Sequence, residues 1–213
     1  MSSFKLVHSH GSKRSKTVGW VIAALLLTGS AVAQANDSDS KFRYLEGNYG
    51  FTTSNNCVRA IPHPPSIVGI DPNTRQLLVP GEAIAQSGLG VMHFFKNGTM
   101  TLEATASEIN FDKTAAGDFP STAGLDGTCR GTYTMAAGSK VTLLFNCHID
   151  IPSTGVSFDL GPTEAVGFMG DHGRSMNLNQ KENIQTVTLF LPNGAMLKSE
   201  RVCVQRFALN KLF

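Results

Sequence analysis

A β-hairpin pattern bounded by two cysteines, at residues 129–147, is the feature that most constrains the fold of this chain. Apolar residues occupy alternate positions along its second arm: Val141, Leu143, Phe145, Cys147 and Ile149. A period of two is typical of a strand with one buried face. Folding the arms about Gly138 places Tyr133 opposite Leu143 and Cys129 opposite Cys147. Directly opposed antiparallel residues have Cα atoms about 4.5–5.5 Å apart, which a disulfide can span. The segment therefore predicts a disulfide-bonded β-sheet protein.

The chain contains four cysteines, at positions 57, 129, 147 and 203. Their even number and the absence of a CxxC spacing favour disulfides over a metal site. Three pairings are possible, and the hairpin register selects Cys129–Cys147. Cys57–Cys203 is then expected, partly by elimination, and it would tie the first strand to the last. We expect no metal ion and no cofactor.

The first 35 residues have the pattern of a secretory signal peptide. Four basic residues precede a short apolar run at residues 18–27, and Ala31, Ala33 and Ala35 satisfy the A-x-A cleavage rule. A membrane-spanning helix would need about 18–20 apolar residues. We therefore expect cleavage after Ala35, a flexible start at 36–41 and a single domain at 42–213. The protein would then be periplasmic or secreted, with no stable membrane anchor.

The charge of the chain does not indicate a nucleic-acid partner. Its formal net charge is +2, but four of the basic residues lie in the predicted signal peptide, which contains no acidic residue. The mature chain would therefore be slightly acidic, without the basic patch that nucleic-acid binding needs.

The remaining sequence reads mainly as strands and turns. Residues 44–53 predict a first strand, and the proline-rich residues 54–88 predict a long loop with a short helix near 81–86. Asn97-Gly98 predicts a two-residue hairpin turn, which would pair Phe95 with Met100 and His93 with Leu102.

Further short strands are expected at residues 156–160, 165–169, 185–191 and 196–207. The last of these carries four charged residues, Lys198, Glu200, Arg201 and Arg206, which suits an outer face or an unpaired edge. Eight or nine strands in sequential hairpins predict an all-β fold, an antiparallel meander that closes into a barrel. A β-sandwich is the alternative.

Several short motifs resemble those of the lipocalin-like (calycin) barrels. Residues 47–49 read Gly-Asn-Tyr on the first strand, where lipocalins carry G-x-W, and a cysteine lies near the last strand. The chain also resembles small exported bacterial proteins of unassigned function, which carry F-x-x-N-G-T (here residues 94–99) and C-x-G-T-Y-T (here residues 129–134). Tyr49 replaces the tryptophan of the lipocalin signature, and no C-terminal helix is expected. The resemblance implies a lipocalin-like barrel of about eight to nine strands.

The candidate ligand-binding residues are those that the predicted registers turn to an apolar interior: His93, Phe95, Leu102, Tyr133 and Phe145. Such a lining suits a small hydrophobic ligand. Asp171, His172 and Ser175 have the composition of a hydrolytic triad, but adjacency in a turn does not give triad geometry. We expect no catalytic residue.

The first hypothesis is therefore passive binding or carriage of a small apolar ligand by an exported β-barrel. A second is a structural or surface-interaction protein whose barrel is filled by its own side chains. A third is an enzyme with His93 or His148 as its base. The sequence names no protein partner.

Overall fold

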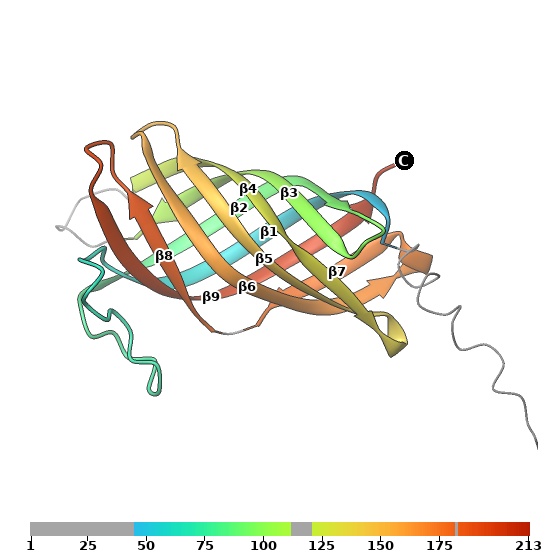
Figure 1. The fold of residues 1–213 in the computed structure, drawn as a ribbon, viewed down its shortest axis with the longest axis horizontal. Coiled ribbons are helices and arrows are strands. Elements are labelled where there is room, and N and C mark those ends of the chain that lie inside the picture. Colours follow the sequence, from blue (N-terminus) through green and yellow to red (C-terminus); the bar gives the residue numbers. More distant parts are fainter. Residues whose placement is uncertain (1–44, 112–120, 182) are drawn as a thin grey trace, which may run out of the picture. The chain divides into compact units, whose positions relative to one another are not determined.

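The computed structural model describes residues 45–111, 121–181 and 183–213. The predicted signal peptide and the start at 36–41 lie outside these ranges. The described residues form nine strands and two single-turn 3₁₀ helices (Figure 1): β1 (Gly47–Ala60), β2 (Gly81–Phe94), β3 (Thr99–Asn110), β4 (Ser121–Ala136), η1 (Ala137–Ser139), β5 (Lys140–Ile151), β6 (Val156–Gly170), η2 (Asp171–Gly173), β7 (Ser175–Gln180), β8 (Ile184–Phe190) and β9 (Met196–Lys211).

The strands form one antiparallel meander that closes into a barrel, as the sequence predicts. Each strand from β1 to β6 pairs with the next, and β9 pairs with β1 to close the ring. β7 and β8 lie end to end between β6 and β9, because β7 pairs with one half of β6 and β8 with the other half. The ring therefore has eight positions, one of which is occupied by two short strands.

Both predicted disulfides are present. In the β4–β5 hairpin, Cys129 is paired with Cys147 and Tyr133 with Leu143, which is the predicted register. Cys57 on β1 faces Cys203 on β9, at the seam that closes the barrel. The Cα atoms are 4.0 Å apart in the first bridge and 4.1 Å apart in the second.

The predicted register of the β2–β3 hairpin is off by one residue. The Gly98 N–H donates to the Phe95 carbonyl, and the Phe95 N–H donates to the Thr99 carbonyl. With Gly98 at a φ of 83°, the connection is a three-residue loop with a bulge, rather than a two-residue turn. His93 is therefore paired with Thr101 and does not face the interior. The extra loop residue reverses the face of every β2 side chain.

The predicted loop at 54–88 is shorter in the structure, spanning residues 61–80, and the helix near 81–86 is wrong. Residues 81–94 are β2, which pairs with both β1 and β3. The apolar alternation of β2 is hidden because polar residues occupy inward positions, among them Glu82 and Gln86.

One further expectation about the later strands is wrong, and another holds only in part. The strands expected at 156–160 and 165–169 are one strand, β6, whose pairing with β5 shifts between Phe145 and Cys147. β9 is no edge, because it pairs with β1 on one side and with β7 and β8 on the other. The outer-face alternative holds for Lys198, Glu200 and Arg206, whereas Arg201 faces inward.

Aromatic side chains close one end of the barrel. The Phe94 ring lies edge-on to Tyr49 and to Tyr133, with centroids 5.3 Å and 5.2 Å apart. The Tyr49 hydroxyl donates to the Gly173 carbonyl at 2.7 Å, and the Tyr133 hydroxyl donates to the Phe95 carbonyl at 2.8 Å. These bonds attach the core to the turns at this end.

Candidate ligand-binding cavity

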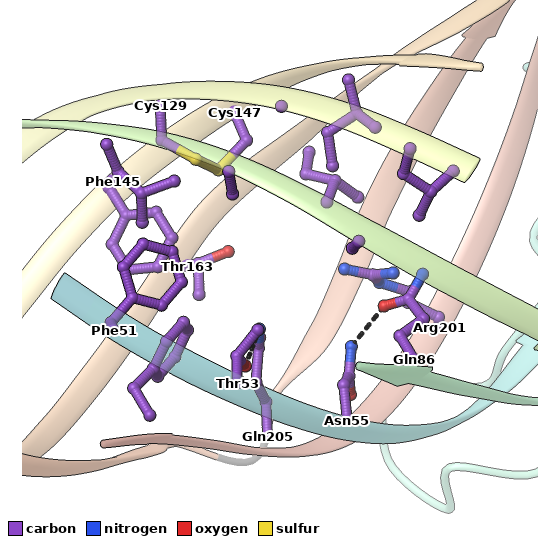
Figure 2. Close-up of a pocket in the computed structure, with 18 residues that line it drawn as sticks. Phe51, Thr53, Asn55, Gln86, Cys129, Phe145, Cys147, Thr163, Arg201 and Gln205 are labelled. Carbon is purple, nitrogen blue, oxygen red and sulfur yellow. Dashed lines mark hydrogen bonds between the residues drawn. A yellow bond between two sulfur atoms is a disulfide. The ribbon is translucent and has the colours of Figure 1, made fainter. Parts of the chain in front are cut away.

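The barrel encloses a cavity of about 90 Å³. Figure 2 shows side chains from opposite walls pointing into the same interior space. The labelled aromatic residues, Phe51 and Phe145, lie at one end, and Asn55, Gln86 and Arg201 lie at the other. The cavity is therefore amphipathic along its length.

The aromatic end is formed by three phenylalanines from three strands. The Phe207 ring lies 6.2 Å from Phe51 and 6.2 Å from Phe145, measured between centroids. All three side chains are buried, and Leu102 and Leu125 also line the cavity. This end offers an apolar surface to a ligand and no charged group among its described residues.

Arg201 is the charged residue at the polar end of the cavity. Its side chain extends inward from β9, and the residue is only 4% exposed. The guanidinium Nε donates to Gln185 Oε1 at 3.0 Å, and Gln185 Nε2 in turn donates to Thr163 Oγ1 at 2.6 Å. Loss of hydration lowers the pKa of Arg201 to about 10, against the opposing effect of the Glu108 charge. The guanidinium therefore still carries its charge at neutral pH.

A second arginine organises the carboxylates near this end. Arg59 forms ion pairs with Glu82 and with Glu108, the latter at 3.3 Å between Nη2 and Oε1. Gln86 Nε2 donates to Glu108 Oε2 at 2.6 Å, and Asn110 Nδ2 donates to Glu82 Oε2 at 2.5 Å. Both carboxylates are thus engaged by Arg59 and by an amide, as buried charges require.

Asn55, which lines the cavity, has a side-chain carbonyl oxygen that accepts no hydrogen bond from a described residue. Its Nδ2 donates to Gln86 Oε1 at 2.7 Å. Its Oδ1 lies 3.0 Å from Cys57 Sγ, but that sulfur is in a disulfide and has no proton to donate. This contact is therefore not a hydrogen bond.

The structure brings only part of the predicted ligand set together. Leu102 and Phe145 line the cavity. Tyr133 is buried but belongs to the aromatic closure at the end of the barrel. Phe95 is 46% exposed in the β2–β3 turn. His93 lies on the outer side, with Nδ1 2.7 Å from Asn48 Oδ1.

Sequence reasoning missed the polar lining, above all Arg201 and Gln205. The alternation of residues along β9 predicts that these two side chains face inward. Cys203 and Phe207 must face inward if the disulfide and the core are to form, and Arg201 and Gln205 fall on the same face at a spacing of two. The charges at Lys198, Glu200 and Arg206 obscured this pattern.

Neither histidine of the enzyme hypothesis lines the cavity. His148 lies on the outer surface, with Nδ1 2.7 Å from Asp159 Oδ1. This hydrogen bond is the main cause that raises the pKa of His148. Among the described residues, no group of three or more histidine, cysteine or acidic side chains is placed to hold a metal ion. The described part of the chain also has no helix long and apolar enough to cross a membrane.

The loop at 61–80 is attached to the side of the barrel at β9. His63 and Lys198 exchange backbone hydrogen bonds of 2.8 Å and 2.7 Å. Glu200 accepts from the Gly69 and Ile70 N–H groups at 2.8 Å each. Since Glu200 alternates with the inward Arg201, these bonds hold the loop against the outer face of the strand.

Two disulfides indicate an oxidising compartment.

Comparison with protein-family models finds no match, and comparison with curated protein sequences finds no relative.

Proposed function

We propose that this protein is an exported binding protein that holds a small, mainly apolar molecule inside its barrel. The observation that carries the proposal is the interior cavity of about 90 Å³, with phenylalanines at one end and polar groups at the other. Ligand sites are commonly mainly apolar with a few polar groups that fix orientation. Passive binding needs no catalytic group.

The size of the cavity limits the ligand. Drug-sized molecules occupy pockets of about 300–1,000 Å³, so this cavity of about 90 Å³ is too small for them. An engineered apolar cavity of about 150 Å³ in another protein takes up benzene or xenon. We therefore expect a ligand of only a few heavy atoms.

Two observations support export and the carrier role. The disulfides favour an oxidising compartment, and the N-terminal 35 residues have the pattern of a signal peptide. The eight-position antiparallel ring agrees with the lipocalin-like resemblance of the motif at residues 47–49. The alternative is a surface-interaction protein with a filled barrel, which the following experiment separates from a binding protein.

Benzene serves as the probe, and its binding is followed by the methyl NMR signals of the protein. The methyl signals of Leu102 and Leu125, which line the cavity, should shift as benzene is added, and the shifts should reach a plateau. Ala104→Leu fills part of the same space and should abolish them. Ala208→Leu, the same change at an exposed position, should leave them intact. Absence of saturable shifts in the unmodified protein would favour the filled barrel and overturn the proposal.

A further inference from the structure

Arg201 is a buried cation that lacks a direct anionic partner. Among the described residues, its one hydrogen bond is the one from Nε to Gln185 Oε1, and no carboxylate forms an ion pair with it. Buried charges in proteins are normally paired, because an isolated ion loses its hydration without compensation. The remaining guanidinium N–H groups belong to a side chain that lines the cavity (Figure 2).

The nearby carboxylates do not supply the missing partner. Glu82 and Glu108 are both paired with Arg59 instead. Glu82 also accepts from Asn110, and Glu108 also accepts from Gln86. The Glu108 charge acts on Arg201 without an ion-pair contact. The two arginines and two glutamates of this cluster have no net charge, so Arg201 lacks a direct partner for its guanidinium rather than a balancing charge, and a ligand carboxylate would supply that contact.

We infer that the ligand is a small carboxylate, whose head group pairs with the Arg201 guanidinium while its apolar chain lies toward Phe51, Phe145 and Phe207. This inference rests on the proposed function and names the ligand class. A guanidinium offers a planar fork of N–H donors that matches a carboxylate bidentately. The distribution of side chains along the cavity agrees, with the charged group at one end and the rings at the other.

The size of the cavity restricts the chain of such an acid. Since benzene, with six heavy atoms, occupies an engineered cavity of about 150 Å³, six heavy atoms is the upper limit for a cavity of about 90 Å³. Butyrate has six heavy atoms and one negative charge at neutral pH. Butyramide has the same shape without the charge, which makes the two a matched pair of probes.

The test measures the Kd of each probe by NMR titration of the protein in its oxidised form. Butyrate should bind at least tenfold more tightly than butyramide, because charge-assisted hydrogen bonds are roughly twice as strong as neutral ones. Arg201→Gln should raise the Kd for butyrate at least tenfold and leave the Kd for butyramide little changed. Arg201→Lys, which keeps the charge but loses the fork, should give an intermediate Kd.

Arg206→Gln is the matched control, since Arg206 is an exposed arginine on the same strand. It should change neither Kd more than twofold. The comparison of butyrate with butyramide on the unmodified protein remains decisive even if an Arg201 variant does not fold. Equal binding of the two probes would overturn the carboxylate inference and leave the proposed function standing. Failure of benzene, butyrate and butyramide alike would overturn both.

Discussion

At the scale of single residues, Tyr49 joins the core to the end of the barrel. It is fully buried, and its hydroxyl donates to the Gly173 carbonyl at 2.7 Å. Burial, with a smaller effect from Tyr133, raises the pKa of Tyr49 to about 12 from its ordinary value of 10. Ionising this phenol would place a charge in the aromatic cluster, so the folded state resists it.

The consequence is an alkaline loss of stability. Because the pKa of Tyr49 is higher in the folded than in the unfolded chain, its contribution is complete below pH 10 and declines between pH 10 and about 12. Between pH 9 and 11 we expect this residue to account for about 1 kcal/mol of lost free energy of unfolding. Urea denaturation at the two pH values measures it.

Tyr49→Phe provides the comparison for this prediction. It should lower stability by about 1 kcal/mol at pH 8, through loss of the hydrogen bond to Gly173. It should also reduce the further loss between pH 9 and 11. An unchanged difference between these two pH values would contradict the assignment of the alkaline loss to Tyr49.

The residue scale also shows what sequence could reveal of the site. Leu102 and Phe145 lie on strongly alternating strands, so their inward direction could be predicted. His93 could not be placed, because a turn one residue longer than expected reverses its face. Arg201 could have been found by counting two residues back from Cys203, but its charge suggested the outer surface. Which inward residues leave a cavity depends on packing between distant strands, which no local pattern contains.

At the scale of elements, close contact between neighbouring strands decides where side chains are tolerated. A Cβ added at Gly131 on β4 would lie 2.1 Å from the Leu144 carbonyl oxygen and 2.6 Å from Phe145 Cβ. A Cβ added at Gly124 on the same strand would meet nothing within 4 Å. Gly131 is half-buried and crowded, whereas Gly124 is exposed with open space beside it, and the two provide a comparison for a stability test.

Gly131→Ala should destabilise the protein by about 1–3 kcal/mol, because the neighbouring β5 backbone must shift to accept the methyl group. Gly124→Ala should change the free energy of unfolding by no more than about 0.5 kcal/mol. Thermal and urea unfolding of both variants measure the difference. Equal effects of the two substitutions would argue against the β4–β5 packing described above.

The elements themselves were predictable where apolar alternation is clean, as in β5. They were not predictable where the barrel interior is polar. The sequence predicts loop and helix over much of residues 81–88, because Glu82, Gln86 and Gly88 occupy inward positions of β2. The sequence predicts two strands in place of β6, because Gly161-Pro162 interrupts the pattern there, and the structure continues one strand through this dipeptide.

At the scale of the whole molecule, the two disulfides constrain the unfolded chain to different extents. Cys57 and Cys203 are 146 residues apart, and Cys129 and Cys147 are 18 residues apart. The first bridge links β1 to β9 and so spans almost all of the described chain. The second closes one hairpin.

Removing each bridge by a pair of alanines should therefore have unequal effects. On the chain-entropy account, loss of Cys57–Cys203 should lower the free energy of unfolding by about 5 kcal/mol, and loss of Cys129–Cys147 by about 3 kcal/mol. Urea denaturation of the two double variants compares them. A greater loss from opening the hairpin would mean that native packing, rather than constraint of the unfolded chain, dominates.

The central claim is that the barrel interior is an accessible binding site rather than filled core. A crystal structure under xenon pressure tests it most directly, because xenon binds apolar cavities without needing a hydrogen bond. The account predicts xenon density inside the barrel, between Phe51, Phe145 and Phe207, and its loss in Ala104→Leu. An interior without xenon, closed by its own side chains, would contradict it.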